Sequence, residues 1–141
     1  MIETKSKQLE EQIIQVLNAN QVCSFATIDG NKPKVRYMAL FHEGLTIYLT
    51  TSKKTDKVDE LKDNPQVHIL VGFDGKSSHD ILQIQATATV SGDNALREKL
   101  WKDDMKEWFE GPHDPNYVVL DISPSNIEYW THGSEPQVWT K

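Results

Sequence analysis

The spacing of apolar residues along the chain predicts three amphipathic helices. Near the N-terminus apolar residues recur every three or four positions, so residues 6–19 are expected to form a helix with one apolar face. A second helix is expected to begin after Thr55, a residue that favours the N-cap position, and to end at Asn64-Pro65. Residues 94–109 have the same periodicity, and Asp93 stands where its side chain can cap them.

Alternation of apolar and polar residues predicts strands between and after these helices. In residues 81–90 the even-numbered side chains are apolar, and those at 83, 85, 87 and 89 are glutamine or threonine. This polar face must meet water, a partner chain or a polar ligand. Further strands are expected at residues 22–28, 35–41, 45–51, 66–73, 117–122 and 126–132, and a polar loop at 74–80. About six strands in hairpin succession predict an antiparallel α+β barrel in a single domain, residues 1–141.

The stretch of residues 35–61 is predicted to organise the rest of the chain. It has the pattern of a strand, a tight turn at Glu43-Gly44, a second strand and a corner that opens a helix. If Glu43-Gly44 forms the loop, Arg36 falls opposite Thr51. If Gly44 makes a bulge, the register slips by one and Arg36 falls opposite Thr50. In both registers Arg36 lies beside the end of the second strand.

The residue types at this corner are those that bind anions. Residues 50–52 all carry hydroxyl groups, and lysines follow at positions 53, 54 and 57. Residues 52–57 are net positive in a chain of formal net charge -6. A helix N-terminus adds unpaired N–H groups and partial positive charge. The corner is therefore a candidate anion site, and the alternative interpretation is a solvated loop of lysines.

Composition narrows the class of protein and its partners. Of the 141 residues, 38% are hydrophobic and 26% are charged, which indicates a globular chain rather than a disordered one. The acidic balance, with a pI near 5.3, argues against nucleic acid or an anionic membrane as the main partner. The N-terminus has no apolar signal core, and no apolar run approaches membrane-spanning length, so the expected compartment is the cytoplasm.

Other chemistry-bearing residues give weaker signals. The five histidines lack the spacing of metal ligands, so no metal site is expected. Cys23, the single cysteine, lies in an apolar strand pattern and is expected in the core. Four tryptophans, at positions 101, 108, 130 and 139, suit either core anchoring or an aromatic wall against a flat ligand or a partner subunit. No side chain is assigned as a catalytic acid or base.

Five segments in order resemble the flavin-binding split-barrel superfamily that includes pyridoxamine 5′-phosphate oxidase, and in particular its general-stress-protein-26-like branch. They are VRYMAL at 35–40, YLTTSKKTDK at 48–57, ELKDNPQVHILV at 60–71, the strand 83–90 with the helix after it, and DISPSNIEYW at 121–130. The resemblance covers nearly the whole chain. It implies a six-stranded antiparallel split β-barrel with flanking helices.

The resemblance also implies an FMN-binding homodimer, a small-molecule ligand, and cofactor sites at the subunit interface. The residues that would hold the cofactor are Arg36, Tyr37, Met38, Ala39, Thr50, Thr51 and Lys57. Arg36 and Lys57 would contact the phosphate, and the backbone of residues 37–39 would line the edge of the isoalloxazine ring. The two threonines would bond to the ribityl chain and the ring region.

The chain departs from the oxidases of this superfamily in two places. Asp56 stands where they usually carry an arginine beside the lysine, so a like charge replaces one phosphate contact. The end of the chain, THGSEPQVWTK at 131–141, lacks the basic stretch that holds pyridoxal phosphate. The leading hypothesis is therefore an FMN-binding, flavin-dependent oxidoreductase. The alternatives are a non-enzymatic dimeric stress or binding protein with weak or no flavin and, ranked third, a true pyridoxamine 5′-phosphate oxidase.

Overall fold

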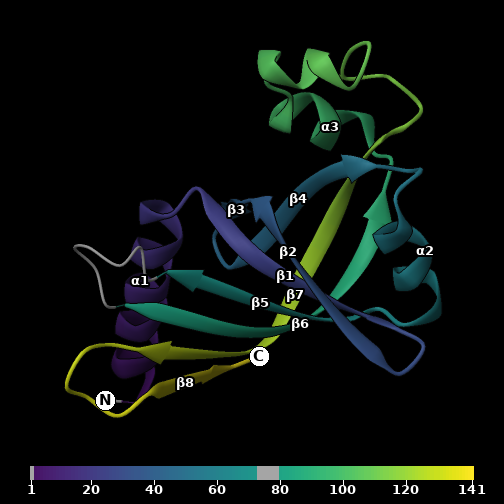
Figure 1. The fold of residues 1–141 in the computed structure, drawn as a ribbon. Helices are drawn as coiled ribbons and strands as arrows, with labels where there is room; N and C mark the ends of the chain where they lie inside the picture. The colour runs from purple at the N-terminus through teal and green to yellow at the C-terminus, as the bar shows by residue number, and fades with distance from the viewer. Residues whose placement is uncertain (1, 73–79) are drawn as a thin grey trace.

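The computed structural model describes residues 2–72 and 80–141, in which eight strands form one antiparallel sheet that curls into a half-barrel (Figure 1). The strands are β1 (Val22–Asp29), β2 (Lys32–Ala39), β3 (Phe41–Glu43), β4 (Thr46–Ser52), β5 (Gln66–Gly72), β6 (Ile81–Ser91), β7 (Tyr117–Trp130) and β8 (Gln137–Thr140). Their spatial order is β2-β1-β5-β6-β7-β4-β3, and β8 pairs with β7. The predicted antiparallel α+β class is confirmed, with eight strands in place of about six.

The helical segments lie at three places around this sheet. They are α1 (Ile2–Ala19), α2 (Asp56–Asp63), α3 (Asn94–Leu100) and the 3-10 segment η1 (Asp103–Glu107). In Figure 1, α1 lies behind β5 and β6, α2 lies at one side, and the segment of α3 and η1 stands beyond the end of β4. The Asn20 side chain ends α1 by donating to the Val16 carbonyl oxygen at 2.8 Å.

The inner face of the sheet and the apolar face of α1 form the main core. Strands β1, β5 and β6 each alternate buried and less buried side chains, as their two-residue periodicity requires. Ile13 and Leu17 of α1 are almost fully buried against this face. A second, smaller cluster lies outside the half-barrel, where Met105, Tyr117 and Val119 are buried under side chains from α3, β3 and β4 and under Trp101 and Phe109.

The predicted pairing of residues 35–41 with 45–51 is wrong in both registers. The chain bends at Leu40, which is buried and whose N–H donates to the Gln21 carbonyl oxygen at 2.9 Å. β2 therefore pairs with β1, and Arg36 lies opposite Phe25. Of the predicted first strand only Phe41 pairs with β4, as part of the short β3, around a tight turn in which Gly44 has a φ of +59°. Burial of Leu40 thus separates two strands that the sequence pattern joins.

The predicted helix over residues 94–109 is interrupted at Trp101. Its start is as expected, because the Asp93 carboxylate accepts a hydrogen bond from the Leu96 N–H at 3.0 Å. The Trp101 and Phe109 rings both pack on the ring of Tyr117, with centroid distances of 5.6 and 5.2 Å. In a continuous helix these two residues would be about 12 Å apart along the axis. The break after α3 allows both contacts.

The C-terminal part also differs from its prediction. The two strands expected at 117–122 and 126–132 form one strand, β7, which bulges at Ser125 opposite Gln85 and Ala86. The bulge accommodates Pro124, which has no N–H to donate to a regular ladder. The tail, for which no strand was predicted, pairs as β8 with β7. The predicted end of a strand at Phe73 and most of the predicted loop at 74–80 lie outside the described residues.

Candidate functional site

Arg36 lies on β2 with its guanidinium on the core side of the sheet, where three oxygen atoms accept its hydrogen bonds. Nη1 donates to Thr27 Oγ1 at 2.8 Å and to the Phe25 carbonyl oxygen at 3.4 Å, and Nη2 donates to Glu60 Oε1 at 3.4 Å. A guanidinium has five N–H donors in a fixed planar array. These three bonds leave two donors without a partner among the described contacts.

Glu60, on α2, is a site residue that the sequence analysis missed. Its carboxylate is buried and accepts hydrogen bonds from Thr27 Oγ1 at 2.7 Å and Lys34 Nζ at 2.9 Å. The Thr27 hydroxyl, followed by the ammonium of Lys34, holds the pKa of Glu60 below its usual value although burial acts in the opposite direction. Glu60 is three residues after Lys57 and shares its side of the helix, but this spacing is equally typical of a solvated helix face and selects no site residue by itself.

Lys57, near the start of α2, is half-buried and lies close to Arg36. Its pKa is lowered, first because burial disfavours the charged form and next because the positive charge of Arg36 repels it. Glu60 and Asp56 oppose this shift. No carboxylate of the described residues lies within ion-pair distance of the Lys57 ammonium. The structure therefore brings together the two cations that the sequence analysis selected.

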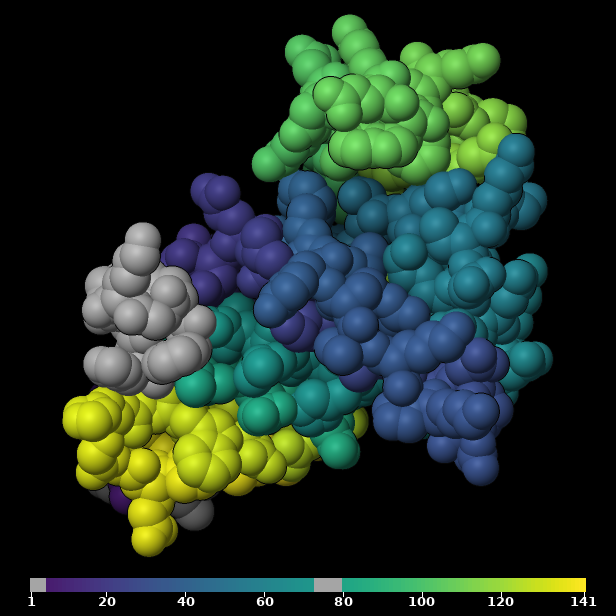
Figure 2. Space-filling view, in the orientation of Figure 1, coloured from purple at the N-terminus to yellow at the C-terminus, as the bar shows by residue number. Residues whose placement is uncertain are grey.

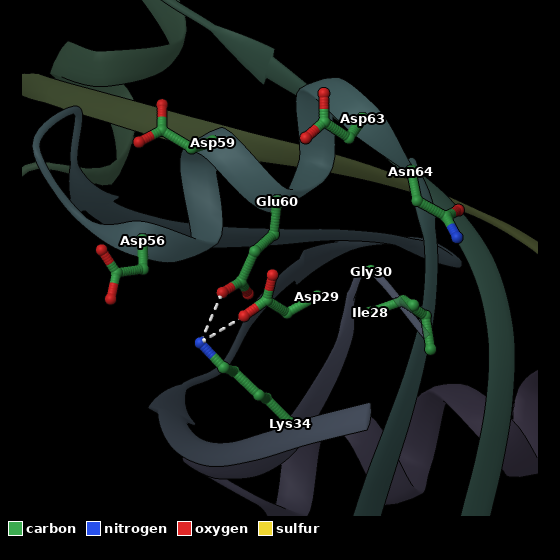
Figure 3. Close-up of a pocket in the computed structure, with 9 residues that line it drawn as sticks. All are labelled: Ile28, Asp29, Gly30, Lys34, Asp56, Asp59, Glu60, Asp63 and Asn64. Carbon is green, nitrogen blue, oxygen red and sulfur yellow. Dashed lines mark hydrogen bonds and ion pairs between the residues drawn. The ribbon is translucent and has the colours of Figure 1, made fainter. Parts of the chain in front are cut away.

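An acidic hollow of about 500 Å³ lies beside this pair of cations, between α2 and the turn after β1. Figure 3 shows its labelled side chains, which include five carboxylates: Asp29, Asp56, Asp59, Glu60 and Asp63. Lys34 reaches between two of them, with its Nζ 3.1 Å from Asp29 and 2.9 Å from Glu60. Because so many carboxylates repel an anion, this hollow does not suit a phosphate.

The hydroxyl-bearing corner is formed as predicted, but its hydrogen bonds differ. Thr55 occupies the N-cap position of α2 without a side-chain bond to the helix, because its hydroxyl donates to the Ser52 carbonyl oxygen at 2.9 Å. Thr51 is buried and lies 3.4 Å from Thr55, oxygen to oxygen. Lys53 and Lys54 are exposed to solvent. The corner therefore fixes the path of the chain into α2.

A cleft of about 660 Å³ opens between this corner and the segment of α3 and η1. One wall consists of Gln21 and residues 39–41, 50–52 and 55, and the other of Lys102, Asp104, Met105, Trp108 and Phe109. Figure 2 shows the second wall, in green, as a lobe above the blue surface of β2 to β4. Ala39, Thr50 and Thr51 of the predicted site line this cleft.

The remaining predicted site residues lie on both sides of β2. Met38 packs against the main core, whereas Tyr37 is 82% exposed on the opposite side and lines a different hollow. β2 is the terminal strand of the sheet and is paired with β1 along one edge. The backbone groups of residues 37–39 that point away from β1 are therefore available to the edge of a planar ligand.

Two negative observations concern the described part of the chain. No group of three or more histidine, cysteine or acidic residues there is arranged to hold a metal ion. No helix there is long and apolar enough to cross a membrane.

Comparisons with known proteins agree on one family. The family model described as pyridoxamine 5′-phosphate oxidase matches residues 9–131. General stress protein 26 of Bacillus subtilis (strain 168) is 38% identical over 133 residues, which cover 94% of this chain and 95% of that protein.

Solved structures show the same fold. The crystal structure of general stress protein 26 from Bacillus anthracis str. Sterne has a TM-score of 0.84 at 28% identity, over 94% of this chain and 98% of that one. A pyridoxamine 5′-phosphate oxidase-related, FMN-binding protein from Nostoc punctiforme PCC 73102 has a TM-score of 0.75 at 15% identity. That match covers 93% of this chain and 90% of that one, and the likeness concerns the fold.

Proposed function

Because the chain belongs to the pyridoxamine 5′-phosphate oxidase family, we propose that it binds FMN at the corner of Arg36 and Lys57 and acts as a flavin-dependent oxidoreductase. Bound flavin supplies the electron-transfer chemistry in such a protein, and the chain supplies position and electrostatics. The chain's own residues would hold the phosphate, orient the ring and shield it from water. The proposed compartment is the cytoplasm.

The observation that carries this proposal is the closeness of two cations, one of which has no counter-ion among residues 2–72 and 80–141. Burial, and next the positive charge of Arg36, lower the pKa of Lys57. A dianionic phosphate between Arg36 and Lys57 would attract both cations and so offset the repulsion between them. Its oxygens would accept hydrogen bonds from the two N–H groups of Arg36 that have no other partner among the described contacts. The first turn of α2 adds further N–H groups at the same corner.

The rest of the donor set fits the other parts of FMN. Hydroxyl groups of Thr50 and Thr51 suit the ribityl chain, and the free backbone edge of β2 suits the polar edge of a flavin ring. We propose that Tyr37, Met38 and Ala39 act there through their backbones. The side chains of Tyr37 and Met38 point to opposite sides of the strand.

We also propose that the chain works as a homodimer with the cofactor sites at the subunit interface. The sheet face opposite α1 supports this, because six of its side chains are large, apolar and exposed: Val22, Val35, Tyr37, Leu70, Trp130 and Val138. Apolar patches of this kind mark association surfaces. This face continues into β2, where the ring of the flavin is proposed to lie.

A second candidate function is that of a dimeric binding or stress protein that holds flavin weakly. Asp56 and Glu60 favour it, because both place negative charge near the proposed phosphate. Oxidation of pyridoxine or pyridoxamine phosphate ranks third, since residues 131–141 lack a basic stretch. Negligible turnover of both compounds by FMN-loaded protein is expected.

A flavin titration of matched variants tests the phosphate assignment. Arg36→Ala and Lys57→Ala should each weaken FMN binding by roughly ten- to hundredfold, because each removes a charge-assisted contact. Riboflavin lacks the phosphate, so its weaker binding should respond to neither substitution. Asp56→Arg should strengthen FMN binding, and all titrations are run at one salt concentration because salt screens exposed charges.

Lys53→Ala and Lys54→Ala are the controls, because both lysines carry the same charge in the same segment but are exposed. They should leave FMN affinity nearly unchanged. Equal effects on FMN and riboflavin, or larger effects at positions 53 and 54 than at 36 and 57, would refute the phosphate site. Absorbance spectra of the purified protein with added FMN show whether flavin binds at all.

A further inference from the structure

Trp108 forms an exposed aromatic wall on the cleft between η1 and β4. Its side chain is 72% exposed, which is unusual for a residue that is mostly buried in globular proteins. Its backbone is held, because the N–H groups of Trp108 and Phe109 both donate to the Met105 carbonyl oxygen at 3.0 Å. Met105 is buried and Phe109 packs on Tyr117. The backbone that carries the indole is therefore fixed, and the ring faces the cleft.

The opposite wall offers hydrogen-bond donors that lack acceptors. Thr50 and Ser52 follow Tyr48 at two-residue spacing on the side of β4 that meets the second cluster. Among the described contacts the hydroxyl of Thr50 has no acceptor, and that of Ser52 only accepts, from the Lys54 N–H. On the same wall as Trp108, the Lys102 ammonium lies 5.0 Å from the centroid of the Phe41 ring and has no carboxylate partner in the described chain. These groups suit a ligand with acceptor oxygens.

The charge and size of the cleft further restrict the class of ligand that it can bind. Lys102 and Asp104 are the charged side chains that line it, and their charges cancel. Neither a cation nor an anion is therefore favoured by the net charge. A volume of about 660 Å³ is within the usual range for small-molecule pockets. Aromatic side chains of Trp108, Phe109 and Phe41 favour a flat ring that can stack or pack edge-on.

We propose that this cleft binds a planar, uncharged aromatic compound with carbonyl oxygens, as a second ligand beside the proposed flavin. Trp108 covers one face of its ring, and the donors of Ser52 and Lys102 bind its oxygens, which leaves the Thr50 hydroxyl to the flavin. The cleft shares Ala39, Thr50 and Thr51 with the proposed flavin site. As a statement about a substrate the inference rests on the proposed function, whereas the binding itself requires no flavin.

Calorimetric titration of flavin-free protein with 1,4-naphthoquinone, a planar uncharged ring system with two carbonyl oxygens, tests the binding. One site per chain is expected. Trp108→Ala should weaken it roughly three- to tenfold through loss of the stacking contact, whereas Trp108→Phe retains a ring and should stay near wild type. Lys102→Met should also weaken it, because the donor is lost while the alkyl stem remains. Trp139→Ala is the control, since the indole of Trp139 bonds to Glu10 and does not line the cleft.

FMN titrations of the same variants separate this inference from the proposed function. Trp108→Ala should bind FMN like wild type, and Arg36→Ala should bind naphthoquinone like wild type. If no variant binds FMN, the proposed function fails while the naphthoquinone result still decides the inference. The inference is overturned if naphthoquinone shows no saturable binding, or if Trp108→Ala and Trp139→Ala have equal effects. It is also overturned if Trp108→Ala weakens FMN and naphthoquinone alike, because the cleft would then belong to the flavin.

Discussion

Glu60 makes the proposed phosphate site dependent on a buried carboxylate. Through the Thr27 hydroxyl and directly, it holds the guanidinium of Arg36 from the core side. The arginine therefore cannot swing freely toward solvent, which lowers the entropy lost when it binds a ligand. The same carboxylate neutralises part of the positive charge that a phosphate needs. Glu60 therefore both orients the Arg36 guanidinium and weakens the positive electrostatic potential that it offers to a phosphate.

Replacement of Glu60 by glutamine should lower the free energy of unfolding at neutral pH. It should also make that free energy less dependent on pH in the acid range. The pKa of Glu60 is depressed in the folded state, so its contribution is complete above the ordinary value of about 4.5 and is lost as pH falls through the lower, folded value. Urea unfolding from pH 7 to pH 2 should show this loss in the wild type and a smaller one in Glu60→Gln. At pH 7 the variant should lose about 1–3 kcal/mol.

Asp59→Asn is the matched control for this prediction. Asp59 is on the same helix and carries the same charge, but it is exposed. Its variant should follow the wild-type curve. Parallel curves for Glu60→Gln and the wild type below pH 4.5 would show that Glu60 makes no pH-dependent contribution.

The cations of the site could be selected from the sequence, but their partners could not. Arg36 and Lys57 stand out because a positive charge in a strand and another at a helix start converge on one corner. Thr27 and Glu60 do not stand out, because a threonine in a strand and a glutamate in a helix are ordinary on a solvated surface. Their burial depends on β2 pairing with β1, a long-range choice that local periodicity does not specify.

At the scale of elements, the segment of α3 and η1 depends on Arg97. Its buried guanidinium donates from Nη1 to the carbonyl oxygens of Asp114 and Tyr117, at 3.0 and 3.2 Å, and from Nη2 to Asn94. The Tyr117 hydroxyl returns a bond to the Arg97 carbonyl oxygen at 2.9 Å. One side chain therefore links α3 to the chain that enters β7. This link also fixes the wall of the cleft that carries Trp108.

Arg97→Met should loosen this segment without unfolding the half-barrel. It removes the guanidinium donor of the buried Tyr117 carbonyl oxygen and one of the two donors of the Asp114 carbonyl oxygen, which keeps the Tyr117 N–H, at about 1–3 kcal/mol in local stability. Because the segment packs on its own small cluster, the loss should be local. Hydrogen exchange followed by mass spectrometry should show faster exchange in peptides from residues 94–116 and unchanged exchange in β5 and β6. Lys99→Met, which loses only an exposed ion pair with Glu43, should exchange like wild type. Equal acceleration in β5 and β6 would contradict the local role.

The elements with strict periodicity could be predicted, and those set by contacts distant in sequence could not. β6 follows its alternation from Leu82 to Ala88 because each inward residue meets the core. The break at Trp101 has no local signal, since its cause is the Tyr117 ring sixteen residues later. β8 has only Val138 and Trp139 as apolar residues, yet the free edge of β7 orders it. Long-range pairing overrides weak local preference in both places.

At the scale of the whole molecule, the curl of the sheet produces two unlike faces. The inner face is filled by α1, whereas in Figure 1 no helix lies in front of β1, β5 and β6. Polar groups on this outer face already bond to each other, as His68 does with Gln83. On this outer face, the polar side chains of β6 thus lie among apolar side chains from neighbouring strands. Such a mixture is typical of protein–protein interfaces.

The homodimer proposal predicts that a charge on the outer face causes dissociation and the same charge elsewhere does not. Leu70 and Val90 form a matched pair, because they are 38% and 37% exposed and lie on opposite faces of adjacent strands. In a two-fold interface each substitution acts twice, so Leu70→Glu buries two unpaired carboxylates. The dissociation constant of the dimer should rise on the order of hundredfold or more.

Sedimentation equilibrium at micromolar concentration should give a dimer for the wild type and Val90→Glu, and a monomer for Leu70→Glu. A monomeric wild type, or equal behaviour of the two variants, would exclude this face as the interface. Loss of FMN affinity in the Leu70→Glu monomer, at intact Arg36 and Lys57, would then show that the partner subunit completes the cofactor site.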